Sequence, residues 1–462
     1  MRQQTNGNTR LLGLIGNPVS HTLSPVIHNT LSELRGLNQL YVPFQVSAEE
    51  LERAVQGAYA LNILGLNVTV PHKNQILNYV VGLDPAAAAI GAVNTLVRTP
   101  EGYQGYNTDM PGLLRAVQSE GIRIQGQTVV ILGAGGAARA VAYMCMREQA
   151  DTVYILNRSV EKAQEIAESM NRMFHTSDMR AMAMKDIAGL PDGPFLVFQC
   201  TSLGLSPDTE AVAVEDPDFY RKVEAGIDLI YNPAETRFMH LVKEAGGRAY
   251  NGLKMLLYQG IIAYELWNGI QVTEEEAELV YDRLYEAVHP PGDNIVLIGF
   301  MGSGKTTVGH LLEQQYGYTF LDTDAWIEEQ EGRSIARIFD EEGEAYFRHL
   351  EQRTLRRLAA DTSHAVISTG GGMPLQQENA RLLRELGQVF YLEVSEEEVW
   401  ERVKNSHDRP LLECADPKAR IHELLTARHP VYRKAAHKQI SVNERTVAEI
   451  AAEIYAYRTG WE

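Results

Sequence analysis

The feature that most constrains this chain is the segment GFMGSGKTTVG, residues 299–309, which directly follows the apolar run NIVLI. It satisfies the pattern G-x-x-x-x-G-K-[ST] between a strand pattern and an amphipathic helix, which is the context that the motif requires. In such loops backbone N–H groups hold phosphates, the lysine bridges the β- and γ-phosphates, and the next hydroxyl binds Mg²⁺. The sequence therefore predicts a nucleoside triphosphate site with Mg²⁺. The residues expected to form it are Gly302, Ser303, Gly304, Lys305, Thr306 and Thr307, with Thr306 as a metal ligand.

A second glycine-rich loop lies upstream, in TVVILGAGGAARA. Residues 133–138 fit G-x-G-x-x-A between a strand and a helix, an arrangement that lets a pyrophosphate approach a helix N-terminus. The next strand ends in LNRS, where an NAD site usually has an acidic residue; a guanidinium there can bind a 2′-phosphate, so NADP(H) is favoured. The helix is expected to bury Ala137, Ala140, Val141, Met144 and Cys145. The expected cofactor contacts are Gly133, Ala134, Gly135, Gly136, Ala137, Asn157, Arg158, Ser159 and Lys162.

Composition excludes several classes of partner. The net charge of −18 argues against a nucleic-acid or anionic membrane surface, which needs a basic face. No apolar run approaches the roughly 18 residues of a membrane span, and the short run after the polar N-terminus does not predict a signal peptide. The three cysteines, Cys145, Cys200 and Cys414, form no C-x-x-C pair, which suits a reducing compartment. We therefore expect a cytoplasmic protein that acts on small molecules.

Three polar clusters precede the upstream glycine loop: GNPVSHTLSPVIHN (16–29), NVTVPHK (67–73) and GAVNTLVRT with GYNTD (91–109). Each follows a predicted strand, at the edge where open α/β sheets bind ligands. Their hydroxyls, amides and charges suit a small polyhydroxylated acid. In the first cluster, Ser24 is expected to be a helix N-cap before Pro25.

Together with YNP (231–233) and NGLKMLLYQG (251–260), these clusters resemble the shikimate dehydrogenase family, from about Gly13 to Gln259. The resemblance implies NADPH-dependent reduction of 3-dehydroshikimate to shikimate, with Lys73 and Asp109 as the catalytic pair. A cationic lysine beside a carboxylate can donate a proton to the alkoxide that forms when a ketone accepts a hydride. The resemblance also implies that the substrate is bound by Thr22, Ser24, Thr69, Lys73, Asn94, Asp109, Tyr231 and Gln259.

Three departures from this family's pattern bear on the substrate. Thr22 stands where the family more often has Ser, Met110 follows NTD where Gly is usual, and QCTS (199–202) replaces the commoner NATS. The relative quinate therefore stays open as a substrate.

Segments behind the P-loop resemble the shikimate kinase family, from Ile295 to about Tyr432: FLDTDAWIEEQEG, IFDEEGEAYFRHLE, VISTGGGMP, HDRPLL and ARHPVYRKAA. The resemblance implies phosphorylation of shikimate at its 3-hydroxyl by ATP. Two arginines on one carboxylate would fix the ring so that its hydroxyl faces the γ-phosphate. By this resemblance, Asp322 lies near Mg²⁺, Asp324 and Lys305 are catalytic, Arg409 lies in a lid over ATP, and the acid is bound by Asp324, Arg348, Gly371, Gly372 and Arg428.

The two resemblances imply consecutive reactions of the shikimate pathway, which leads to aromatic amino acids, in one α/β chain. Short β-branched runs alternate with amphipathic stretches from end to end, which predicts α/β units with parallel sheets. We expect an N-terminal substrate domain, an NADP-binding Rossmann domain, and a P-loop kinase domain with a parallel sheet. HPPGDN would interrupt the helix expected from about Glu274 to Val288. The predicted bounds are 1–112, completed by helices at about 251–288, then 113–250, a linker at 289–294, and 295–462.

Two alternatives stay open. One is a quinate-using dehydrogenase joined to a small-metabolite kinase, and the other is a regulatory sensor in which one domain is inactive. Every catalytic position that can be placed is filled, which argues against the sensor. A monomer and a homodimer are both compatible with the sequence.

Overall fold

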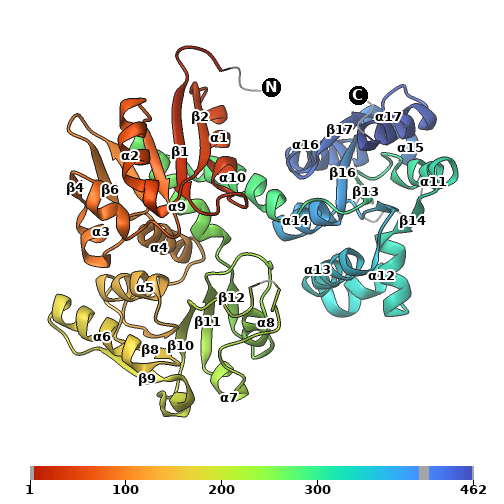
Figure 1. Cartoon of the computed structure of the whole chain (residues 1–462). Helices are drawn as coiled ribbons and strands as arrows, with labels where there is room; N and C mark the ends of the chain where they lie inside the picture. Colours follow the sequence, from red (N-terminus) through yellow and green to blue (C-terminus); the bar gives the residue numbers. More distant parts are fainter. Residues whose placement is uncertain (1–4, 206, 405–415, 460–462) are drawn as a thin grey trace. The chain divides into compact units, whose positions relative to one another are not determined.

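The computed structural model describes residues 5–205, 207–404 and 416–459 (Figure 1). The chain divides into two compact units, Met1–Val288 and His289–Glu462. The first unit holds two six-stranded sheets, and the second holds one five-stranded sheet. In the ranges described, no helix is long and apolar enough to cross a membrane.

The first sheet has the strand order β2-β1-β3-β5-β6-β4. Strand β1 runs parallel to β2 and β3, whereas β5 is antiparallel to β3 and β6. The expectation of parallel sheets is therefore wrong for this part, because only a short turn, and no helix, separates β5 from β6. The strands are β1 (Arg10–Gly16), β2 (Gln39–Gln45), β3 (Gly65–Val68), β4 (Gly82–Leu83), β5 (Thr95–Arg98) and β6 (Tyr103–Tyr106). The helices are α1 (Ser24–Leu34), α2 (Leu51–Ala60), α3 (Pro85–Ile90) and α4 (Asp109–Ser119).

The second sheet is parallel throughout, with the order β12-β11-β10-β7-β8-β9. The strand order reverses at β7, and open sheets of this kind bind ligands at the carboxyl ends of the strands beside that point. The strands are β7 (Thr128–Leu132), β8 (Thr152–Asn157), β9 (Met179–Ala183), β10 (Phe195–Gln199), β11 (Val223–Asp228) and β12 (Arg248–Tyr250). The helices are α5 (Gly136–Arg147), α6 (Val160–Phe174), α7 (Pro217–Tyr220) and α8 (Arg237–Glu244).

Two later helices, α9 (Leu253–Asn268) and α10 (Glu274–Val288), pack against elements of the first sheet's half. Helix α9 lies so close to α4 that a Cβ at Gly112 would be 2.6 Å from the backbone nitrogen of Gln259. At its other end, Trp267 donates a hydrogen bond to the carbonyl of Leu96 at 2.9 Å. The chain therefore returns to the first half after completing the second sheet.

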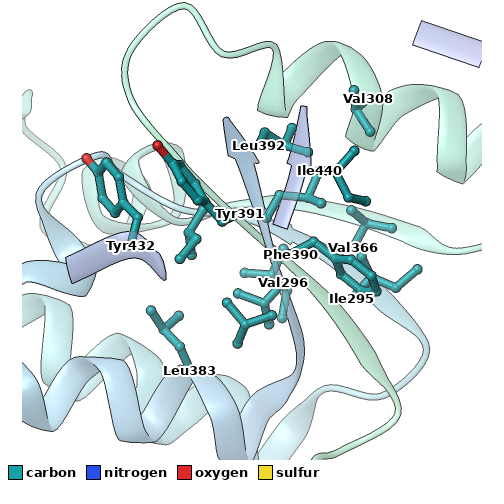
Figure 2. Packing of buried hydrophobic residues seen from close by; sticks show 14 of the residues in the cluster. Ile295, Val296, Val308, Val366, Leu383, Phe390, Tyr391, Leu392, Tyr432 and Ile440 are labelled. Carbon is teal, nitrogen blue, oxygen red and sulfur yellow. The ribbon is translucent and has the colours of Figure 1, made fainter. Parts of the chain in front are cut away.

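The second unit has a parallel sheet in the order β14-β15-β13-β16-β17. Figure 2 shows Ile295 and Val296 of β13 packed beside Phe390 of β16, and all three are fully buried. Continuous apolar strands of this kind are typical of a parallel sheet covered on both faces. The strands are β13 (Asn294–Ile298), β14 (Thr319–Asp322), β15 (Ala365–Ser368), β16 (Gly387–Glu393) and β17 (Lys438–Ser441). The helices are α11 (Lys305–Tyr316), α12 (Thr323–Glu331), α13 (Ile335–Asp361), α14 (Gln377–Leu386), α15 (Glu396–Val403), α16 (Pro417–Ala435) and α17 (Val447–Thr459).

The predicted α/β class, with a Rossmann-like fold and a P-loop domain, is confirmed, but two local expectations are wrong. Helix α1 begins at Ser24 itself, its N-cap is Leu23, and the Ser24 hydroxyl accepts a bond from Thr22 Oγ1 at 3.2 Å instead of capping the helix. Ala137 is exposed and Ala138 is buried in its place, because the first turn of α5 lies at the surface beyond β7.

Candidate active sites

The first site is built around a lysine and a carboxylate. Lys73 follows β3, and Asp109 is the first residue of α4. The Lys73 Nζ donates to Asp109 Oδ2 at 2.6 Å, while Asn94 Nδ2 donates to Asp109 Oδ1 at 2.9 Å. The side chains of Lys73 and Asp109 are 31% and 20% exposed, so the pair is accessible but partly shielded from water. Both carboxylate oxygens thus have a donor, and the ammonium has a counter-charge.

The other expected substrate residues lie in segments that follow strands or in helix α9. Thr22 and Ser24 follow β1, and Thr69 follows β3, so they lie at the same edge of adjacent parallel strands. Gln259 of α9 is buried, with its Nε2 donating to the carbonyl of Leu256 at 2.8 Å. Tyr231 packs against the apolar cluster that includes residues at the start of α1 and in α9, and burial raises the pKa of its hydroxyl.

The loop after β7 has the geometry of a phosphate-binding turn. Gly133 has φ +111°, and a Cβ there would lie 3.1 Å from Thr201 Cγ2 and 3.2 Å from the carbonyl oxygen of Cys200. Only glycine fits this close, left-handed turn. Gly135, Gly136 and Ala137 are exposed, so the N-terminal N–H groups of α5 face outward, where they suit an anion.

The end of β8 presents the residues expected to select the cofactor. Arg158 and Lys162 are exposed, and no ion pair of Arg158 occurs in the described part of the chain. Asn157 Nδ2 donates to the carbonyl of Ser159 at 2.9 Å, and Ser159 Oγ donates to Glu161 at 2.8 Å. The guanidinium is therefore available to an anionic ligand, although one carboxylate lies on the same turn.

The second unit contains a cavity of about 570 Å³ at the P-loop. Lys305 Nζ donates to the carbonyls of Gly299 and Phe300 at 2.9 and 3.1 Å, so it lies along the loop. The expected nucleotide residues all line the cavity: Gly302, Ser303, Gly304, Lys305, Thr306 and Thr307. Asp322, Asp324, Gly370 and Gly371 line it as well.

Two aspartates stand together at this cavity. Asp322 caps α12, its Oδ1 accepting from the backbone N–H of Asp324 at 3.0 Å. A Cβ at Gly370 would lie 2.5 Å from Asp324 Oδ1, so the turn after β15 packs directly on this carboxyl group. Burial, and then the neighbouring Asp322, raise the pKa of Asp324 to about 6, although Lys305 and Arg348 oppose the shift.

The expected arginines converge on the same glycine turn. Arg348 donates from Nη1 to Glu351 and from Nη2 to Glu344, both at 2.9 Å. A Cβ at Gly372 would lie 3.1 Å from Arg348 Nη1, and one at Gly371 would lie 3.9 Å from Arg428 Nη1. Asp324, Arg348 and Arg428 therefore surround residues 370–372. The predicted lid residue Arg409 lies outside the described residues.

Three residues that the sequence interpretation missed belong to this site. Arg402 and Arg445 line the P-loop cavity, and Arg402 Nη1 donates to the carbonyl of Gly302 at 2.9 Å. Glu351 is 1% exposed beneath Arg348, and burial raises the pKa of its carboxyl group. Arg402 could have been predicted, because it lies in the helix that follows β16, the strand next to the P-loop strand β13. For Glu351 the sequence offered only its position three residues after Arg348 on the same helix.

The metal expectation rests on Thr306 and Asp322, which share the cavity. Among the described residues, no group of three or more His, Cys, Asp or Glu side chains is arranged to hold a metal. This set fits Mg²⁺ nonetheless, because Mg²⁺ at nucleotide sites is typically held by one or two protein oxygens together with phosphates and water.

Comparisons with protein families match both units. The family model described as shikimate dehydrogenase substrate binding domain matches residues 14–96, and that of shikimate / quinate 5-dehydrogenase matches 115–198. The model described as shikimate kinase matches residues 301–458. These matches confirm both resemblances.

Known relatives support the first unit in particular. The chain is 42% identical over 266 residues to the shikimate dehydrogenase (NADP(+)) of Desulforamulus reducens, covering 57% of this chain and 91% of that protein. Shikimate 5-dehydrogenase from Thermus thermophilus, solved in complex with NADP(H) and shikimate, superposes with a TM-score of 0.53 at 31% identity, covering 60% of this chain and 100% of that one. A chorismate mutase/shikimate 5-dehydrogenase fusion protein from Clostridium acetobutylicum gives 0.55 at 32% identity, covering 61% and 99%.

Proposed function

Since the chain belongs to the shikimate dehydrogenase family and ends in a shikimate kinase domain, we propose that it catalyses two consecutive reactions. The first is NADPH-dependent reduction of 3-dehydroshikimate to shikimate. The second is phosphorylation of shikimate by ATP at the 3-hydroxyl. The observation that supports this proposal is that each unit brings expected site residues together: Lys73 and Asp109 in the first unit, and Asp324, Arg348 and Arg428 around residues 370–372 in the second.

In the dehydrogenase, Lys73 and Asp109 are the reacting side chains. Bound NADPH supplies the hydride. Lys73, cationic beside Asp109, donates a proton to the substrate oxygen and stabilises the charge that develops there. Thr22 and Ser24 bind the carboxylate. Thr69, Asn94, Asp109 and Gln259 contact the hydroxyls, and Tyr231 lies near the substrate.

The cofactor would lie between α5 and the end of β8. The exposed N-terminal turn of α5 and the left-handed Gly133 suit a pyrophosphate. Arg158 binds the 2′-phosphate, assisted by Lys162, because a guanidinium can make bidentate bonds to phosphate. The partner is thus NADPH in preference to NADH.

In the kinase, Arg348 and Arg428 bind the carboxylate of shikimate, while Asp324 orients or deprotonates the accepting hydroxyl. Lys305 leaves the loop carbonyls for the β- and γ-phosphates. When bound, Mg²⁺ neutralises phosphate charge, and Thr306 and Asp322 hold it. Arg402 and Arg445 add positive charge on the nucleotide side of the cavity. The free thiols Cys145 and Cys200 suit the reducing cytoplasm, where both cofactors are available.

One assay tests both activities. The purified chain receives 3-dehydroshikimate and NADPH while nicotinamide absorbance is followed, and ATP with Mg²⁺ is then added and the acid phosphate measured. Lack of NADPH oxidation would refute the dehydrogenase, and ADP release without an acid phosphate would refute the kinase. Quinate with NADP⁺, run in parallel, tests the alternative that the dehydrogenase uses quinate.

A further inference from the structure

A buried chain of polar side chains leads from α1 and β2 to Asp109, and the proposed mechanism does not use it. It consists of His28, Tyr41, Asn67, Thr95 and Thr108, which are all at most 4% exposed. Burying this many polar groups is costly unless every member is satisfied. The pattern of its hydrogen bonds shows what the chain does.

Asn67 is the centre of this network. Its Nδ2 donates to the carbonyl oxygen of Asn94 at 3.3 Å and to Thr95 Oγ1 at 3.1 Å. A carbonyl can only accept, so the orientation of the Asn67 amide is fixed and its Oδ1 must face the other way. There it accepts from the Tyr41 hydroxyl at 2.8 Å and lies 3.2 Å from His28 Nε2. All the bonding capacity of Asn67 is used inside the protein, and none is left for a substrate.

The direction of these hydrogen bonds determines the tautomer and the charge of His28. Because Asn67 Oδ1 is an acceptor, His28 Nε2 must carry the hydrogen, and Nδ1 is buried without a partner. Protonation of Nδ1 would place a charge where nothing accepts it, and burial lowers the pKa of His28 to about 3. The imidazole is stacked on Tyr41 with ring centroids 4.2 Å apart, so it is a fixed neutral donor.

A second backbone group fixes the amide that touches Asp109. The N–H of Thr108 donates to Asn94 Oδ1 at 2.7 Å, so Asn94 must turn its Nδ2 towards Asp109 Oδ1. The hydroxyls of Thr95 and Thr108 lie 3.1 Å apart, and each lies 3.1 Å from Asn94 Oδ1. Asn94 Nδ2 also donates to Thr108 Oγ1 at 3.0 Å. The Asn94 amide is thereby held on both sides.

We propose that Asn67, Thr95 and Thr108 are positioning residues of the dehydrogenase: they hold the Asn94 amide against one oxygen of Asp109, so that the other oxygen stays on Lys73. This inference rests on the proposed function of that site. It assigns Asn67 to the support of the site and not to substrate binding. The two threonines act through the hydrogen bonds of their hydroxyl groups, which methyl groups cannot make.

Paired substitutions at Thr108 separate the hydroxyl from the packing. Thr108→Val keeps the shape but removes Oγ1, and it removes no helix cap, because the Thr108 side chain does not cap α4. We expect Thr108→Val to lower kcat for 3-dehydroshikimate roughly 10-fold or more, since small displacements of reacting groups cost that much, while the KM for NADPH stays within about twofold. Thr108→Ser, which restores the hydroxyl, should stay within about threefold of the parent.

Thr30→Val is the matched control. Thr30 is a buried threonine of the same unit, 5% exposed, whose Oγ1 lies 3.4 Å from Arg283 and outside the network. The kcat of Thr30→Val should equal that of the parent, and its thermal stability should be similar. If Thr108→Val does not fold, Thr95→Val and Thr95→Ser carry the same expectations.

The possible results separate this inference from the function on which it rests. A parent chain that does not oxidise NADPH would refute the proposed function itself. An active parent with an equally active Thr108→Val would overturn the positioning role. Equal losses in Thr108→Val and Thr108→Ser would also overturn it, because packing and not the hydroxyl would then be responsible.

Discussion

The two lysines that we propose to be catalytic stand in contrasting surroundings. Lys73 has its carboxylate partner in place, 2.6 Å away in Asp109, whereas Lys305 lies against two backbone carbonyls of its own loop. The reacting charges of the dehydrogenase are thus already paired within the protein. In the kinase, we expect Lys305 to exchange these loop carbonyls for the phosphates of the nucleotide.

The acids of the two sites differ in the same way. Asp109 receives a donor on each oxygen, whereas Asp324 stands beside a second carboxylate, and its pKa is raised to about 6. Arg348, the nearby cation expected to bind the substrate, is already engaged by Glu344 and Glu351. A substrate carboxylate in the kinase must therefore compete with the ion pairs that Arg348 already makes.

The largest expected effect comes from removing either lysine. Lys73→Ala should lower reduction by about 10²- to 10⁴-fold and spare phosphorylation, because proton donation at one site is lost. Lys305→Ala should abolish phosphorylation and spare reduction. The two activities are measured in each variant, so each is the control for the other. Loss of both activities in a folded variant would show that the units do not act independently.

Arg348 should give the next largest effect. Arg348→Ala should raise the KM for shikimate about 10- to 100-fold, the value of one charge-assisted hydrogen bond, with less change in the KM for ATP. Glu351→Gln should raise the same KM by a smaller factor, because the amide still fills the space but orients the guanidinium less firmly.

Arg356→Ala is the control for this prediction. Arg356 lies on the same helix, and its partner Glu378 is 3.6 Å away at the surface. Shikimate kinetics in this variant should match the parent. An unchanged KM for shikimate in Arg348→Ala would remove Arg348 from the acid site.

Substitution of Arg158 tests how the dehydrogenase binds its cofactor. Arg158→Ala should raise the KM for NADPH by roughly 10-fold and leave the KM for NADH nearly unchanged, because only NADPH carries the 2′-phosphate. Steady-state assays with both cofactors measure the effect, with exposed Arg172 on α6 substituted as the control. Equal losses with the two cofactors would contradict the phosphate role.

The sequence was most informative where one short motif defines both local structure and chemistry. Both glycine loops could be identified because a strand, a fixed glycine spacing and a helix occur together, and the structure has them in that order. It failed where distant segments meet. Nothing local marks Glu351 as the residue beneath Arg348, or Arg445 as part of the P-loop cavity.

The remaining errors have a similar cause. Ser24 carries a cap residue's side chain, but its hydroxyl is engaged by Thr22, two residues away. The antiparallel pair β5–β6 arises from a short turn that interrupts the helix–strand alternation. Sequence spacing also does not reveal that the hydrogen bonds of Asn67 are all made within the protein.

A last prediction concerns the stability of the dehydrogenase unit and an acid that has no cationic partner among the described residues. Asp228 is fully buried at the end of β11, where it accepts from Thr236 Oγ1 at 2.6 Å and from the N–H of Ile230 at 3.0 Å. Burial raises its pKa from 3.8 to about 6, although these hydrogen bonds oppose the shift. Between those two values the folded state binds more protons than the unfolded state does. The stability that this group contributes is therefore complete below about pH 4 and is lost as the pH rises through about 6.

The pH dependence of unfolding tests this prediction. The parent's unfolding free energy should fall by up to ~3 kcal/mol from this group between pH 4 and pH 7, and Asp228→Asn should lack that slope. Calorimetry of the full chain measures it on the transition that NADPH shifts upward, since a ligand stabilises the unit that binds it. Asp218→Asn, at an exposed position in α7, is the control and should keep the parent's slope. Parallel slopes in the parent and Asp228→Asn would contradict the raised pKa of Asp228.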